Sequence, residues 1–145
     1  IFVKGFDGLG LKTLSNIFSL FGNSFKNFIF IEVGVVEAGV FKGSNGIQLM
    51  EEKAKEDVNS YVKLVNKYGY YGEGVYSIGT ELIEEVVKIT PSVLARFPNS
   101  VFFAGQMVFA KDSVFSKVLH NHTVFSLQEK LYRKGIPFIT IPVNV

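Results

Sequence analysis

Three glycines after the first apolar run form the strongest candidate for a binding site in this chain. Gly5, Gly8 and Gly10 surround Asp7, directly before a segment with helical spacing. Backbone N–H groups at the start of a helix, together with the helix dipole, favour an anion. If the chain has a ligand site, we therefore expect it at Gly5, Asp7, Gly8 and Gly10. The alternative is a tight turn that requires small residues.

This glycine loop does not match the common nucleotide-binding motifs. A phosphate-binding loop requires Lys directly after its last glycine, whereas Leu11 separates Gly10 from Lys12. One extra residue rotates a helical side chain by about 100°, away from the phosphate. The dinucleotide fingerprint also fails, because Thr13 stands where its third glycine belongs. We expect neither productive nucleotide binding nor a bound cofactor.

The two histidines do not predict a metal site. His120 and His122 would point about 200° apart on a helix, and the chain has no cysteine. The nearest acidic residues, Asp112 and Glu129, stand at least seven positions away. We expect a helix break near His120 and no metal. Since no glycine–serine nucleophile motif occurs either, the chain is not expected to be an enzyme.

Acidic residues occur in two other settings. Glu32 lies inside an apolar run, where we expect it to pair with a neighbour such as Lys4 or to sit at the edge of a strand ladder. The alternative is a buried, unpaired carboxyl group with a raised pKa. Charges of alternating sign in Glu51–Asp57 predict a solvated helix face with ion pairs between residues four apart.

Composition indicates one folded domain over residues 1–145. Hydrophobic residues make up 48% of the 145 positions, and fifteen Phe and six Tyr provide material for an aromatic core. Charged residues are 19%, below the usual level of about 25%. A net charge of +2 gives no electrostatic footprint for nucleic acid.

Short apolar runs alternate with longer segments of helical spacing along the whole chain. This alternation predicts a three-layer α/β domain with a five-stranded parallel sheet and helices on both faces. Although Leu14–Val36 contains few charges, Gly22 divides it into a helix and a buried strand, so we do not expect it to span a membrane. The predicted strands are Ile1–Phe6, Asn27–Val36, Tyr70–Ser77, Ser100–Phe109 and Ile136–Val145.

Several residues predict where the helices begin and end. Asp7 can cap the first helix and Gly22 can end it. Thr80 can cap the third helix, and Pro91 after Thr90 predicts a kink or a restart within it. Asp112 or Ser113 is expected to cap the last helix.

The last predicted strand is a candidate edge for self-association. Pro137 and Pro142 suit a strand on or near the edge of a sheet. Ile139, Ile141 and Val143 share one face of this strand, and an uncovered edge could pair with a second copy to form a homodimer. The alternative is a covered edge.

Two family resemblances extend these expectations. The chain length, the element order and the pair Asp7-Gly8 after the first strand resemble the universal stress protein fold, which implies the strand order 3-2-1-4-5. ATP-binding members carry a glycine signature after the fourth strand. Here Gly105 is followed by no glycine until Gly135, so the resemblance does not extend to ATP binding.

The second resemblance covers most of the chain. Lys26–Val36, Arg96–Phe109 and Leu119–Val145 look like the cytosolic C-terminal domain of bacterial amino acid permeases of the amino acid–polyamine–organocation superfamily. The resemblance implies a non-catalytic regulatory or assembly domain at the cytoplasmic face of the membrane, with the membrane domain of the same polypeptide as its partner. A start at Ile1 rather than Met fits this expectation. The alternative is a nucleotide-sensing module of the universal stress type that binds an anion at the first loop.

Overall fold

Strands and helices alternate throughout the computed structural model, which describes residues 1–37, 43–108 and 114–144. This alternation confirms the predicted element order. The elements are β1 (Phe2–Val3), α1 (Gly8–Phe21), β2 (Asn27–Val35), α2 (Gly43–Lys67), β3 (Tyr71–Gly79), α3 (Leu82–Arg96), β4 (Phe102–Val108), α4 (Val114–Arg133) and β5 (Phe138–Asn144).

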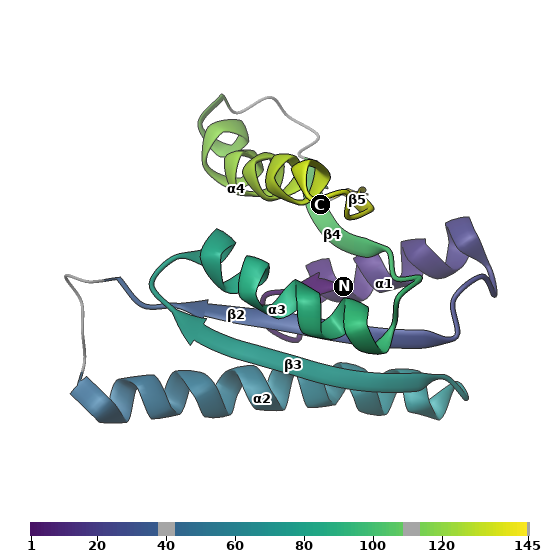
Figure 1. Ribbon diagram of the computed structural model, residues 1–145, viewed down its shortest axis with the longest axis horizontal. Coiled ribbons are helices and arrows are strands. Elements are labelled where there is room, and N and C mark those ends of the chain that lie inside the picture. The colour runs from purple at the N-terminus through teal and green to yellow at the C-terminus, as the bar shows by residue number, and fades with distance from the viewer. Residues whose placement is uncertain (38–42, 109–113, 145) are drawn as a thin grey trace.

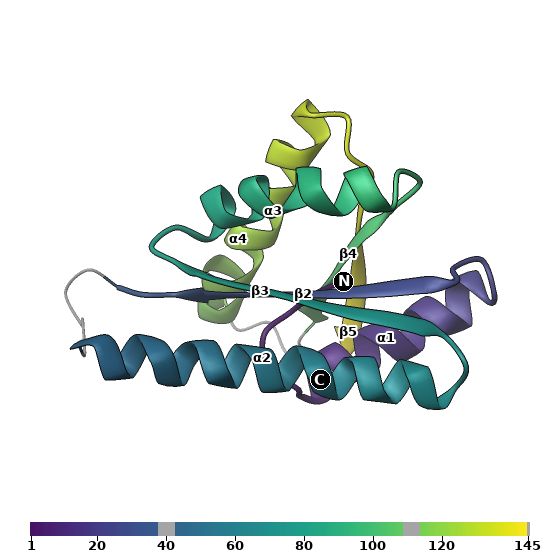
Figure 2. The same cartoon turned by 60° about the horizontal axis from the view of Figure 1, so that its bottom comes forward.

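The five strands form one parallel sheet in the order β3-β2-β1-β4-β5. Helices α1 and α2 cover one face of the sheet, and α3 and α4 cover the other (Figure 1, Figure 2). The predicted fold class and strand order are therefore confirmed. Because the chain reverses its direction of winding between β1 and β4, the carboxyl ends of these two strands form the topological switch point, where ligands bind in this class of sheet.

Aromatic rings fill much of the layer between the sheet and helices α1 and α2. Phe30 of β2 stacks on Tyr61 of α2, with ring centroids 4.9 Å apart and an angle of 15° between the planes. The ring of Phe18 on α1 lies 5.0 Å from that of Phe28, with an angle of 32° between the planes. Both Phe30 and Tyr61 are completely buried, so the strand–helix contact excludes water at the centre of the domain.

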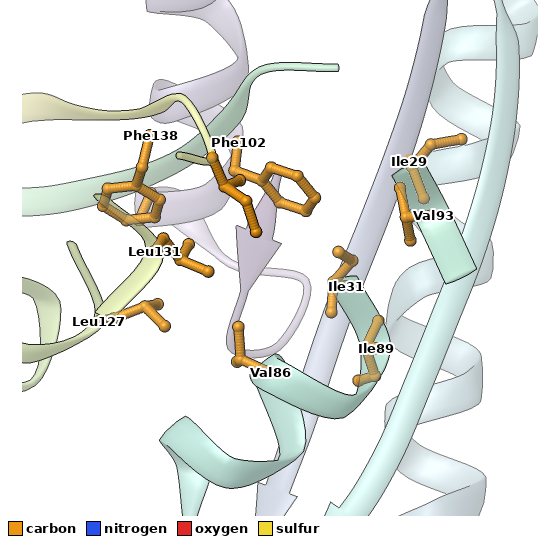
Figure 3. Packing of buried hydrophobic residues seen from close by; sticks show 11 residues of the cluster. Ile29, Ile31, Val86, Ile89, Val93, Phe102, Leu127, Leu131 and Phe138 are labelled. Carbon is orange, nitrogen blue, oxygen red and sulfur yellow. The ribbon is translucent and has the colours of Figure 1, made fainter. Parts of the chain in front are cut away.

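Aliphatic side chains dominate the opposite layer, beneath α3 and α4. Figure 3 shows residues from α3 and α4 converging on the side chains of β2, β4 and β5. Burying each of these side chains stabilises the fold by about 1.5–3 kcal/mol. The labelled members of this cluster are Ile29, Ile31, Val86, Ile89, Val93, Phe102, Leu127, Leu131 and Phe138.

The start of α1 follows the prediction, whereas the start of α3 does not. Asp7 caps α1 and Gly22 ends it. Helix α3 begins at Leu82, and its N-cap is Glu81 rather than Thr80. A contact between elements fixes this end: the hydroxyl of Ser77 on β3 donates a hydrogen bond of 2.5 Å to Glu85 in the first turn.

Helix α3 runs without interruption through Pro91, so the predicted restart is wrong, whereas the kink given as its alternative stays a prediction. Proline cannot donate a backbone hydrogen bond, which leaves the carbonyl four residues earlier, that of Val87, without its usual partner. The hydroxyl of Thr90 donates to this carbonyl oxygen at 3.4 Å. Buried side chains before and after the proline, Val86 and Val93, hold both halves of the helix on the sheet.

Helix α4 is also continuous past His120, where a break was predicted. Its described backbone contains neither Gly nor Pro, and His and Asn lower helix stability by less than about 1 kcal/mol each. The predicted capping residues, Asp112 and Ser113, lie outside the described residues. No helix in the described part of the chain is both long and apolar enough to cross a membrane.

Candidate functional site

The loop after β1 lies at the topological switch point and contains all four predicted ligand residues. Gly5 has a φ angle of 82°, a left-handed conformation that suits glycine. Asp7 is the N-cap of α1, and Gly8 and Gly10 lie in the first turn of that helix. The structure therefore brings Gly5, Asp7, Gly8 and Gly10 together.

Several N–H groups of this loop already have partners within the protein. The amide of Gly10 donates to the Asp7 carboxylate at 2.9 Å, and that of Gly5 donates to the Glu32 carboxylate. The amide of Asp7 lies 3.5 Å from the hydroxyl oxygen of Tyr61 and donates to it. The protein's own side chains thus occupy N–H groups that an anion would require.

Close packing explains one of the glycines directly. A Cβ atom at Gly10 would lie 1.8 Å from the hydroxyl oxygen of Tyr61, which is fully buried. The same hydroxyl donates to the carbonyl oxygen of Gly5 at 3.0 Å. Burial raises the pKa of Tyr61 to about 12, so this group stays protonated and keeps donating. Gly10 fits the alternative prediction of a tight turn that requires small residues.

Glu32 is a buried carboxyl group in this site with one unpartnered oxygen. Only 9% of the residue is exposed, and Oε2 has no hydrogen-bond partner. Lys4 is exposed and forms no ion pair with it in the described structure. The expected Lys4 pairing is therefore wrong, and the alternative of a buried carboxyl without an ion-pair partner is confirmed for the described residues. Burial, and then the negative charge of Asp57, raise the pKa of Glu32 to about 7.

A second buried carboxylate comes from α2. Asp57 is 6% exposed, and both of its oxygens lie 2.5 Å from Nζ of Lys53. This contact confirms an ion pair between residues four apart in the charge run, but Asp57 itself is not solvated. The hydrogen bond to Asp57 raises the pKa of Lys53.

The charges of the site favour protons over anions. Three carboxyl groups, from Asp7, Glu32 and Asp57, stand near one ammonium group, that of Lys53. A phosphate placed at the loop would meet the negative charge of these carboxylates. Glu32, by contrast, can exchange a proton near neutral pH. Among the described side chains, no group of three or more acidic or histidine residues could hold a metal.

Sequence reasoning did not identify Asp57 and Tyr61 as members of this site. A signal was present, because Tyr61 lies on the apolar stripe of α2 and Asp57 precedes it by one helical turn. Because Asp57 lies within a run of charged residues, its position on the apolar stripe was not recognised. The helical backbone of α4 includes His120 and His122, but their side chains lie outside the description.

The predicted self-association strand, β5, does lie at an edge of the sheet. The amide of Phe102 on β4 donates to the carbonyl of Pro137 at 2.9 Å. In a parallel ladder, alternate residues face alternate sides, so the backbone groups of Phe138, Thr140, Pro142 and Asn144 face the open side.

Side chains of the neighbouring helices cover several carbonyl groups on this open side, and Pro142 has no N–H to offer. The donor–acceptor pairs are Tyr132–Phe138 at 3.1 Å, Asn16–Pro142 at 3.3 Å and Lys12–Asn144 at 3.2 Å. Such features protect an edge against strand addition.

The three predicted interface side chains point into the domain. Ile141 and Val143 are each 2% exposed, and Ile139 packs against the α1–α2 core. Pairing with a second copy at β5 stays a prediction, and it would involve backbone groups rather than these side chains.

Comparison with known proteins gives no assignment to set beside this geometry. No protein-family model matches the chain, and no curated protein or solved structure is significantly similar to it.

Proposed function

We propose that this chain is a non-catalytic domain of a bacterial amino acid permease, at the cytoplasmic face of the membrane, and that it acts in the assembly or regulation of transport. The observation that carries the proposal is the resemblance of three segments to the C-terminal domain of these permeases. In the fold, the segments provide β2, β4 and the pair α4–β5. They make up much of the sheet, so the resemblance concerns the framework of the domain.

The site at the switch point disfavours the alternative of nucleotide sensing. Glu32, Asp7 and Tyr61 already bind the N–H groups of Gly5, Gly10 and Asp7. An incoming phosphate would have to displace the carboxyl groups of Asp7 and Glu32. Burial already disfavours the negative charge of Glu32 at this place. Calorimetry with ATP, AMP and cyclic dinucleotides tests this point. Micromolar binding that is lost on substitution of Asp7 would favour the nucleotide-sensing alternative.

A domain of this kind can influence a transporter only by contacting its alternate states differently. Its effect on the equilibrium between outward-facing and inward-facing states equals the difference between the two contact free energies. The proposed domain therefore needs an attachment to the membrane domain through which movement of one part displaces the other.

The decisive experiment begins with the natural polypeptide. We expect the coding sequence upstream of Ile1 to contain a series of apolar segments of about 20 residues each. A start codon a few residues before Ile1 would contradict the proposal. Where the segments are present, deletion of residues 1–145 is expected to change the transport rate or the assembly of the permease in vesicles. A truncated transporter with unchanged transport and assembly would exclude a regulatory or assembly role.

A further inference from the structure

A cavity of about 360 Å³ lies at the amino ends of the central strands. Its walls include Phe28 and Ile29 from β2, Phe102 and Phe103 from β4, and Val93 from α3. Figure 3 shows Phe102 on one side, with Ile29 and Val93 on the other. The cavity thus lies between two strands of the sheet, and much of its wall is apolar.

The strand register shows what shape would fit between these walls. Strand β1 has two residues, whereas β2 has nine and β4 has seven. Phe2 lies opposite Ile31 on β2 and Ala104 on β4. If the register continues by one residue at a time, Ile1 is opposite Phe30, and three further positions of an extended strand would be opposite Ile29, Phe28 and Asn27.

Hydrogen bonds at Ile1 already follow this ladder. Its nitrogen donates to the carbonyl of Ile29 at 2.7 Å, and its carbonyl accepts from the amide of Ile31 at 2.9 Å. Ile1 is buried, and burial lowers the pKa of this amino group to about 5. An uncharged peptide N–H at the same place would keep the bond to Ile29 without the cost of burying a charge.

We propose that this cavity is a slot for an extended segment that continues β1 toward its amino end, and that the occupant is the stretch of the permease polypeptide that leads into this domain. The identity of the occupant rests on the proposed function. With this segment in place, the central strand of the sheet is itself the attachment to the membrane domain. A strand held between β2 and β4 transmits displacement directly, unlike a flexible linker.

The alternation of the strand defines the side chains that the slot accepts. Ile1 belongs to the core beneath α1 and α2, and Phe2 packs on the core beneath α3 and α4. In an extended strand the residue before Ile1 therefore faces the α3 side, near Val93, and the residue before that faces the α1 side, near Phe25. Both positions favour β-branched residues.

A designed extension tests the slot without the natural preceding sequence. The residues Val-Ile-Val joined to Ile1 should raise the unfolding midpoint by about 3 °C or more over a matched Gly-Ser-Gly extension. The two variants remove the charge of the Ile1 amino group equally, so their difference measures filling of the slot. The added Val and Ile amides should also exchange hydrogen more slowly than those of the control.

Equal midpoints together with fast exchange of the added amides in both variants would overturn the proposed slot. The gene sequence upstream of Ile1 tests the source of the occupant separately. If the designed extension stabilises the domain but the gene encodes no membrane segments upstream, the slot is supported and its assignment to a permease is wrong. If the gene encodes membrane segments but the designed extension does not stabilise the domain, the permease is supported and the slot is wrong.

Discussion

The hydroxyl group of Tyr61 on α2 donates a hydrogen bond of 3.0 Å to the carbonyl oxygen of Gly5, the residue at which the chain turns after β1. This contact joins residues 56 positions apart. It connects the first loop, which contains the predicted ligand residues, to helix α2.

Removal of this hydroxyl tests how strongly α2 holds the loop. Tyr61→Phe leaves the carbonyl of Gly5 and the amide of Asp7 without this partner, so we expect the free energy of unfolding to fall by about 1–2 kcal/mol. Urea denaturation measures the change. The matched control is Tyr70→Phe, which removes an exposed hydroxyl bonded to Asn23 and should cost less than about 0.5 kcal/mol. Equal losses in both variants would contradict a special role for Tyr61.

A methyl group at Gly10 should be far more damaging than one at Gly8. The Cβ atom of Gly10→Ala would overlap the hydroxyl of Tyr61, which is completely buried. We expect a loss of about 2–3 kcal/mol in thermal or urea unfolding. Gly8→Ala is the control, because its Cβ meets nothing within 4 Å, and alanine favours the helix by up to about 1 kcal/mol. If the two variants unfold alike, the close approach to Tyr61 is not what requires glycine.

Glu32 should make the stability of the domain depend on pH. Its pKa is about 7 in the folded protein and 4.5 as its ordinary value, so the folded state binds the proton more tightly than the unfolded state. The stabilisation that comes from this tighter proton binding is fully present in the free energy of unfolding below pH 4.5, and it is lost as pH rises through 7. We expect Glu32→Gln to remove this fall and to be the more stable variant at pH 8, by about 1–2 kcal/mol.

The measurement is chemical denaturation from pH 4 to pH 8. Glu51→Gln, an exposed substitution on α2, controls for the change in net charge and should keep the pH profile of the parent. A Glu32→Gln profile with the same slope as the parent would show that Glu32 does not titrate in this range.

Uncovering the β5 edge should increase self-association. The triple variant Lys12→Ala, Asn16→Ala and Pro142→Val removes two side-chain donors from edge carbonyls and adds a backbone N–H. An unprotected edge pairs readily with another strand, so we expect light scattering to show a larger mass at the same concentration. Lys55→Ala, on the exposed surface of α2, should leave the mass unchanged. An unchanged mass for the triple variant would indicate that these groups do not protect the edge.

The sequence predicted the features of this fold that depend on periodicity. Alternating apolar runs located all five strands, and Pro142 identified β5 as an edge. Local rules failed at two points in α3 where side-chain hydrogen bonds decided the outcome. Within the helix, Thr90 supplies a hydrogen bond that no propensity scale includes. At the start of the helix, the contact comes from Ser77 on another element.

The candidate site was predicted in part, for a related reason. Its glycines and Asp7 adjoin one another along the chain and could be found as a motif. Glu32 could be identified as unusual, but its environment depends on Asp57, which is distant in sequence. A carboxylate within a run of alternating charges has the same local pattern whether it faces solvent or the core.

The contact between Thr90 and Val87 also concerns how this sequence can vary. While Pro91 is present, the hydroxyl of Thr90 replaces the missing backbone donor. A chain with alanine at position 91 would regain that donor, and the hydroxyl would become dispensable. Substitutions at Thr90 and Pro91 are therefore coupled. Loss of the Thr90 hydroxyl destabilises the helix while Pro91 is present, and destabilises it much less once Pro91 has been replaced.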